Sequence, residues 1–369
     1  MANSKDADAF EGTKLTRREM MRLAGGLLAA GGLTLLLPEG RIFPLSTAEG
    51  AVGMVDTSRY KKPGPWTVGR AGAGDVNAWM IMFSAHYEYG IKERHKGKFK
   101  DYFVTAANFD PGKQINDVED LLSKRIDLLF IDPISEAALV ASVEKAMDRG
   151  IPVILGSTRV KTEKYVSWIT TNNVKAGFLY GDWMGKRLKG EGSVLILLGA
   201  PGSSYAEENL KGIRQAFLNY PGIKEAQVVY ASWSPVEAKK ATEAAIQAGK
   251  KIDGIISGGL MGLGAVDAFV SQRKPIPPVG ADDWNGWLKK AKQHKVEFYA
   301  VAGGSAMSSR AVDVAVKVLS GEPVPRYVEY PQKTFDSSQL TKYLREDLND
   351  NYWAIHELPE SWVTKLYKK

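Results

Sequence analysis

Short apolar runs alternate with longer amphipathic stretches along the chain from Trp66 onward. Runs such as Asp127–Ile131 have the length and continuous apolar character of strands that are buried on both faces. The stretch that begins at Asp110 instead spaces apolar residues such as Ile115 and Val118 as one face of a helix. This alternation is typical of parallel sheets with crossover helices, so the pattern predicts an α/β fold.

The predicted strands fall into two groups of similar size, separated by a helix. The first group comprises Trp66–Ala71, Tyr102–Ala107, Asp127–Ile131, Ile151–Leu155 and Val166–Thr170, and the second comprises Ser193–Leu198, Gln227–Ser232, Ile252–Ser257, Pro278–Ala281 and Glu297–Val301. Two consecutive halves of this kind predict two α/β lobes, each built on its own parallel sheet.

Local signals mark where several helices begin and end. The segment Ser234-Pro235-Val236-Glu237 has the form of a capping box with proline at the first helical position. Gly249 is a suitable end for that helix, and Ser135 can cap the helix that ends at Gly150. Each signal supports a helix between two predicted strands.

The first 48 residues have the features of an export signal rather than of a folded element. Arg17 and Arg18 precede an uncharged apolar run, Leu23–Leu37, which is shorter than the roughly 20 residues of a membrane-spanning helix. Small residues at Ser46-Thr47-Ala48 form a cleavage-type site. The segment resembles a twin-arginine signal, and a retained membrane anchor is the alternative. Residues 49–65, with two prolines, are expected to be an exposed leader.

The composition of the chain excludes several kinds of functional site. At 369 residues the chain is long enough for about two domains. The absence of cysteine excludes disulfides, thiolate metal sites, iron–sulfur clusters and cysteine nucleophiles. The net charge of +7 is spread along the chain, so no nucleic-acid partner is expected.

The usual signatures of α/β enzymes are missing. The glycines at 72 and 74 begin a dinucleotide-binding motif, but its third glycine position is Asn77. No Gly-Lys pair is followed by Ser or Thr, and the four histidines form no H-E-x-x-H motif. We therefore expect neither catalysis nor a cofactor or metal. An exported α/β enzyme for a small polar substrate remains the alternative.

Polar and aromatic residues follow the predicted strands at their carboxyl ends, where open parallel sheets bind ligands. Aromatic rings cover the C–H faces of a polyhydroxylated ligand, and planar polar groups bind pairs of its hydroxyls. The alternative is that Trp79 and Trp284 belong to the core, while Asn77 and Asp282 cap helices. The candidate ligand-binding residues are Asp75, Asn77, Trp79, Asn108, Asp132, Ser157, Thr158, Arg159, Tyr205, Glu207, Trp233, Gly258, Asp282 and Trp284.

Several segments together resemble the ribose-binding-like, type I periplasmic substrate-binding proteins of sugar ABC importers. They begin at Asp110 (DPGKQINDVEDLL), Ile126 (IDLLFIDP), Ala146 (AMDRGIPVI), Thr171 (TNNVKAG) and Val279 (VGAD), and the likeness covers roughly residues 66–330. The resemblance implies two Rossmann-like lobes that are joined by three hinge strands and close on a ligand. Lac-repressor-type regulators share the fold but begin with a helix-turn-helix, where this chain has its signal.

The resemblance also assigns roles to individual residues. It places the hydroxyl-binding aspartate of the family at Asp282, and its polar-aromatic loop at Asn77 and Trp79. Departures from the family pattern favour a monosaccharide other than ribose or a polyol, with a small amine-bearing ligand as the alternative. These departures are Ser157-Thr158 in place of an Asp-Arg pair, with Arg159 one position later, Glu207 in place of Arg, and Gly258 in place of Asn.

The implied domain plan follows from the predicted crossings between the lobes. The chain is expected to cross near residues 170–172, 301–303 and 326–329. The N-terminal lobe then comprises residues 66–170 and 302–326, and the C-terminal lobe comprises 171–301 and 327–369. The last 40 residues, with Tyr352-Trp353 and Trp362, are expected to form a strap packed on one lobe.

These features together predict a periplasmic, monomeric receptor without catalytic activity. It would capture a sugar or polyol by lobe closure and deliver it to an ABC transporter permease. Closure allows a permease to distinguish the loaded receptor from the empty one. A sensory receptor that passes the signal to another protein is a further alternative.

Overall fold

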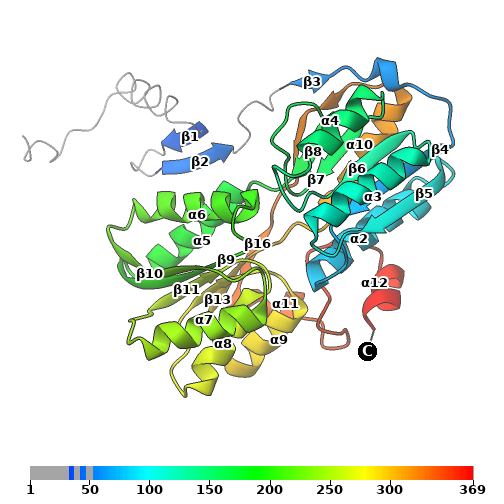
Figure 1. Ribbon diagram of the computed structural model, residues 1–369. Coiled ribbons are helices and arrows are strands. Elements are labelled where there is room, and N and C mark those ends of the chain that lie inside the picture. Colours follow the sequence, from blue (N-terminus) through cyan, green and yellow to red (C-terminus); the bar gives the residue numbers. More distant parts are fainter. Residues whose placement is uncertain (1–32, 37–41, 47–52, 369) are drawn as a thin grey trace, which may run out of the picture.

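The computed structural model describes residues 33–36, 42–46 and 53–368, which form two α/β lobes side by side (Figure 1). The export signal predicted for residues 1–48 lies almost entirely outside the described residues. Two short strands within it, β1 (Leu33–Leu36) and β2 (Ile42–Ser46), pair with each other in antiparallel fashion.

The first lobe contains a six-stranded parallel sheet in the order β15-β8-β7-β6-β4-β5. Its strands are β4 (Trp66–Gly72), β5 (Phe99–Ala106), β6 (Leu128–Ile131), β7 (Val153–Gly156), β8 (Ser167–Thr170) and β15 (Tyr327–Glu329). Its helices are α2 (Ala78–Tyr89), with a π-helical continuation at Gly90–Arg94, α3 (Pro111–Ser123), α4 (Val140–Asp148) and α10 (Met307–Ser320).

Helices cover both faces of this sheet, which explains the continuous apolar runs of its strands. Along β6, Leu128 and Phe130 pack with residues of α2 and α10, whereas Leu129 and Ile131 pack with residues of α3 and α4. Successive side chains of a strand point to opposite faces, so a strand between two helical layers needs an apolar residue at every position.

The second lobe has a sheet in the order β10-β9-β11-β12-β13-β16, in which only β16 is antiparallel. Its strands are β9 (Glu191–Leu198), β10 (Gly222–Tyr230), β11 (Gly254–Ser257), β12 (Val279–Ala281), β13 (Phe298–Val301) and β16 (Thr334–Asp336). Its helices are α5 (Asn173–Arg187), α6 (Ser204–Phe217), α7 (Pro235–Gln247), α8 (Met261–Ser271) and α9 (Asn285–His294).

The predicted helix signals are observed in part. The Ser234 hydroxyl accepts a hydrogen bond from the backbone N–H of Glu237 at 3.3 Å. The second half of the capping box is not observed: the backbone N–H of Ser234 donates to the carbonyl of Ala231 at 2.8 Å, and the Glu237 carboxylate accepts from Lys240 at 2.9 Å. Gly249 follows the helix with a positive φ of 72°, as expected for a helix end. Ser135 lies four residues ahead of the observed cap of α4, Leu139, and its hydroxyl accepts from the N–H of Ala138 at 3.3 Å in the turn between them.

The chain passes between the lobes after β8, after β13 and after β15. The first two crossings lie where the sequence places them. The third lies after Glu329, at the end of the predicted range 326–329. Residues 327–329, which the domain plan gives to the C-terminal lobe, belong to the sheet of the first lobe, because β15 pairs with β8 there before the chain reaches β16 in the second sheet.

The segment predicted to be an exposed leader is partly folded onto the first lobe. Strand β3 (Met54–Val55) pairs with β14 (Val324–Pro325), and a 3-10 helix, Ser58–Tyr60, buries the ring of Tyr60. The pairing joins positions some 270 residues apart, so the local sequence carries no signal for it.

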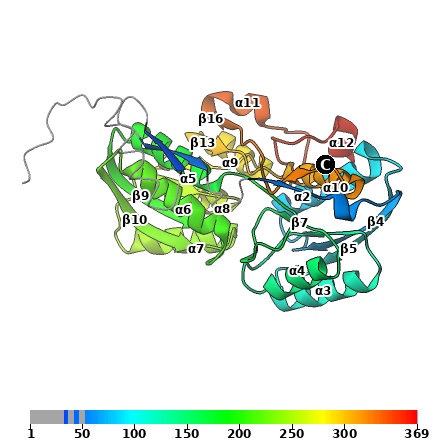
Figure 2. The same ribbon diagram turned by 90° about the horizontal axis from the view of Figure 1, so that it is seen from above.

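The C-terminal segment after β16 contacts both lobes rather than one. It contains a 3-10 helix (Ser337–Gln339), α11 (Leu340–Tyr343) and α12 (Glu360–Tyr367) (Figure 2). The buried Trp353 forms a β-bridge with Trp284 of the second lobe. The Trp362 ring of α12 packs edge-on against Tyr89 of the first lobe, with ring centroids 5.5 Å apart. This strap, residues 337–368, therefore spans the two lobes.

Candidate functional site

A cavity of about 400 Å³ lies between the lobes, at the carboxyl ends of the strands of both sheets. Loops after β4, β5, β6 and β7 line it from the first lobe, and loops after β9, β10, β11 and β12 line it from the second. Its size is in the range of small-molecule sites, and its position is where parallel sheets bind ligands.

The start of α2 forms one wall of the cavity. Asn77 caps this helix, because its side-chain oxygen accepts from the backbone N–H of Met80 at 3.0 Å. Trp79 stacks on Phe83, with ring centroids 4.7 Å apart, and its indole N–H donates to the carbonyl of Gly303 at 2.9 Å. Both residues line the cavity, so Asn77 combines the capping role with a place at the site.

Asp132 lines the cavity and is paired with a buried arginine. Its Oδ2 accepts from Nε of Arg70 at 2.7 Å, and its Oδ1 accepts from the Tyr87 hydroxyl at 3.2 Å. Both members of the ion pair are at most 4% exposed. Burial raises the pKa of Asp132 above its ordinary value, and the charge of Arg70 opposes this shift. The positive charge of Arg70 is thus engaged within the protein and is balanced by Asp132.

Asp282 lies on the second-lobe side of the cavity and has no cationic partner among its recorded contacts. Its Oδ1 accepts from the Tyr180 hydroxyl at 2.8 Å, and its Oδ2 accepts from the backbone N–H of Gly259. Burial, reinforced by the neighbouring Asp283, raises the pKa of Asp282 well above its ordinary value. The following helix, α9, is capped at Trp284. The capping role considered for Asp282 is therefore not observed.

Aromatic side chains form much of the remaining wall. The rings of Tyr205 and Trp233 lie with centroids 6.2 Å apart on the second lobe. The Trp233 indole fills a slot left by two glycines: a Cβ atom at Gly199 would lie 2.2 Å from the ring, and one at Gly259 would lie 2.7 Å from it. These glycines fix the position of the indole.

The structure brings eight of the fourteen sequence-predicted residues to the cavity. These are Asn77, Trp79, Asp132, Ser157, Thr158, Tyr205, Trp233 and Asp282. The other six, Asp75, Asn108, Arg159, Glu207, Gly258 and Trp284, lie outside its lining.

The charged residues outside the lining have partners elsewhere. Arg159 lies 3.4 Å from Glu136 and 4.0 Å from Glu208, measured between nitrogen and carboxylate oxygen. The exposed Glu207 accepts from the Tyr230 hydroxyl at 2.8 Å. Among the residues that the structure describes, the cavity is lined by two carboxylates and by no lysine, arginine or histidine.

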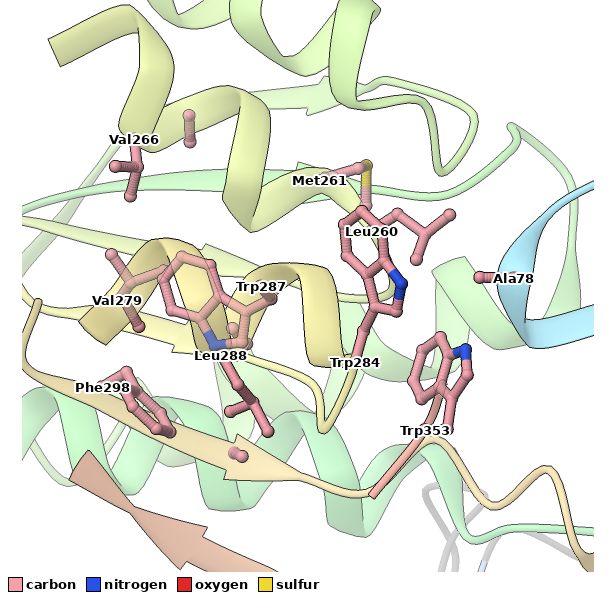
Figure 3. Packing of buried hydrophobic residues seen from close by; sticks show 14 of the residues in the cluster. Ala78, Leu260, Met261, Val266, Val279, Trp284, Trp287, Leu288, Phe298 and Trp353 are labelled. Atoms are coloured by element: carbon pink, nitrogen blue, oxygen red, sulfur yellow. The ribbon is translucent and has the colours of Figure 1, made fainter. Parts of the chain in front are cut away.

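The remaining residues outside the lining lie in the core, behind a lining side chain or at the surface. Trp284 belongs to a buried cluster with Leu260, Trp287 and Trp353 (Figure 3), which corresponds to the core alternative. Gly258 lies behind Tyr205, since a Cβ atom there would be 3.1 Å from the Tyr205 hydroxyl. Asp75 and Asn108 are exposed.

Sequence reasoning missed Phe109, which lines the cavity beside the exposed Asn108. Phe109 follows the same predicted strand as Asn108, Tyr102–Ala107, so its position after the end of a strand marked it as a possible ligand contact. The side chain of Phe109 has no hydrogen-bonding group, and the pattern therefore selected the neighbouring asparagine instead.

Residues 77–323 match the family model described as the periplasmic binding protein domain. The chain belongs to this family. Membership implies a periplasmic protein, in agreement with the expected export. Within the described part of the chain, no helix is long and apolar enough to cross a membrane, and no group of three His, Asp or Glu side chains is arranged to hold a metal ion.

Individual relatives of this periplasmic binding protein include two curated proteins. A xylitol-binding protein of Mycolicibacterium smegmatis is 30% identical over 255 residues, which are 68% of this chain and 73% of the relative. A ribose import binding protein of Bacillus subtilis is 26% identical over 252 residues, 68% of this chain and 82% of the relative. The Asp282 and Asp132 positions of the cavity both lie within the matched domain.

Solved structures confirm the two-lobed fold. An ABC transporter solute-binding protein of Bacillus halodurans with bound myo-inositol superposes with a TM-score of 0.70 at 21% identity, covering 76% of this chain and 98% of that one. A galactofuranose-binding protein gives a TM-score of 0.70 at 21% identity, covering 75% and 97%. The predicted type I periplasmic binding protein fold is thereby confirmed.

Proposed function

We propose that this protein is the solute receptor of an ABC importer and that it binds a small, neutral, polyhydroxylated ligand, either a monosaccharide or a polyol. The observation that carries this proposal is the cavity between the lobes. It combines aromatic walls with two buried carboxylates, and its described lining contains no basic side chain. Such a lining suits C–H faces and hydroxyl donors, whereas it gives no charge partner to a carboxylate or phosphate ligand.

The relatives support this ligand class, since one is named a xylitol-binding protein and the other a ribose import binding protein. The departures of this chain at Ser157, Thr158 and Gly258 from the ribose-binding pattern favour a ligand other than ribose. Ser157 and Thr158 offer hydroxyls to the cavity in place of an acid–base pair. We further propose that the receptor is monomeric, is exported through the twin-arginine pathway and does not catalyse a reaction.

A thermal-shift screen tests the proposal. The panel contains polyols such as xylitol and myo-inositol, aldopentoses and aldohexoses, and the corresponding sugar acids. A ligand that binds only the folded state at a concentration 100 times its Kd stabilises that state by about 2.7 kcal/mol. We expect a neutral member of the panel to raise the Tm and the matching acid to leave it unchanged. A rise with the acids alone would contradict the proposed ligand class.

A further inference from the structure

Phe109 of the first lobe and Trp233 of the second form an aromatic pair across the cavity. Their ring centroids lie 6.4 Å apart, and the rings are tilted by 47°. This geometry is within the range of attractive aromatic pairs. Both rings line the cavity. Since they belong to different lobes, any opening of the cleft at this pair has to separate them.

Both rings are presented from backbone in the left-handed region. On the first lobe, φ is 53° at Asn108 and 61° at Phe109; on the second, φ is 50° at Ser232 and 55° at Trp233. Non-glycine residues avoid this conformation unless surrounding contacts enforce it. Two adjacent residues of this kind therefore occur on each side of the same contact.

The surrounding contacts hold each loop in place. The backbone N–H of Phe109 donates to the carbonyl of Ala73 at 3.0 Å, and the next residue, Asp110, caps α3 by accepting from the N–H of Lys113 at 3.1 Å. On the second lobe, the N–H of Ser234 donates to the carbonyl of Ala231 at 2.8 Å, and the indole of Trp233 lies in the slot between Gly199 and Gly259. Both rings are thus preorganised for contact.

We infer that Phe109 is a latch residue, which binds Trp233 and stabilises the closed cleft even before a ligand is bound. The inference rests on the proposed function, because closure is how the receptor encloses its ligand. The latch also bears on specificity. A ligand that extends between the two rings has to keep Phe109 and Trp233 apart and loses this contact, so ligands that leave the pair intact are favoured.

The distance between the lobes in the unliganded protein tests the latch. Because the chain has no native cysteine, spin labels can be placed at Ser123→Cys on α3 and Lys240→Cys on α7, both of which are exposed. Double electron–electron resonance then reports the populations of closed and open molecules. Loss of an aromatic pair of ordinary strength changes the ratio of closed to open molecules by about twofold to twelvefold.

In the labelled parent we expect a resolved short distance that represents the closed form. Phe109→Ala should lower the closed-to-open ratio by about twofold to twelvefold, whereas the matched control Phe109→Tyr, which keeps the ring, should preserve it. Circular dichroism verifies that each variant is folded.

Three results would overturn the inference: a parent that shows the open distance alone, an unchanged ratio in Phe109→Ala, or an equal loss in Phe109→Tyr. No ligand enters this measurement. The two failures are therefore distinguishable: a failed ligand screen contradicts the proposed function and leaves the measured populations unchanged, whereas a failed latch leaves the ligand screen to decide the function.

Discussion

Replacing Asp282 by asparagine separates ligand binding from folding at the centre of the cavity. In the wild-type protein the Asp282 carboxylate accepts from Tyr180 and from the N–H of Gly259, and no cation is recorded beside it. The asparagine oxygen can keep the bond from Gly259, and its NH₂ group can donate to the Tyr180 oxygen. Tyr180 can in turn donate to the carbonyl of Ala281, which is already 2.9 Å away. The substitution therefore leaves no buried polar group unpaired.

We expect Asp282→Asn to keep or raise the free energy of unfolding at neutral pH. Burial raises the pKa of the wild-type carboxyl, so the folded state binds its proton more tightly than the unfolded state does. The contribution of Asp282 to the free energy of unfolding is fully present below the unfolded pKa of 3.8. It is lost as the pH rises through the pKa that the carboxyl has in the folded state. Asp282→Asn has no carboxyl at this position, so this fall in the free energy of unfolding with rising pH should be absent. Urea denaturation at several pH values would detect the difference.

The effect on ligand binding should be opposite. A charge-assisted hydrogen bond is worth about 1.5–3 kcal/mol, so the loss of one such bond to a ligand hydroxyl weakens binding by about tenfold to 150-fold. The assay is calorimetric titration with the polyol or sugar that gives the largest thermal shift. Glu207→Gln is a matched control, because it neutralises a carboxylate that lies outside the cavity lining. Wild-type affinity in Asp282→Asn, or an equal loss in Glu207→Gln, would refute the reasoning.

Three further predictions concern export, closure and the strap. Arg17→Lys together with Arg18→Lys should abolish periplasmic accumulation in cell fractionation, because a twin-arginine receptor reads the arginine pair; normal periplasmic levels would contradict this signal type. A saturating ligand should lower the radius of gyration in solution scattering, and an unchanged radius would count against closure. Trp353→Ala should cost about 3–5 kcal/mol in urea denaturation, because it empties a buried indole site between Trp284 and Gly303; a cost below about 1 kcal/mol would show that the strap adds little stability.

The alternation of strands and helices was predictable because it depends on local patterns. Strands such as β6 are covered on both faces by helices, so their apolar runs are continuous and easy to identify. Pairings that involve the ends of the chain had no such signal. Strand β3 joins β14, and the strap reaches from Trp284 to Tyr89, through contacts between residues that are far apart in sequence.

The site was predictable to the level of loops but not of individual side chains. Strand ends identified the correct loops, whereas the direction of each side chain depends on the backbone of the loop. Asp282 lines the cavity, while the next residue, Asp283, turns away and accepts from the N–H groups of Gly303 and Ile355. In the same way Phe109 reaches the cavity and its neighbour Asn108 does not.

The most direct test of the central claim is calorimetric titration of the purified wild-type protein with the neutral polyol or sugar that gives the largest thermal shift. The receptor function predicts one molecule bound per chain, saturable heat and recovery of the ligand chemically unchanged. Absence of binding across the neutral panel, or conversion of the added compound into a product, would contradict it.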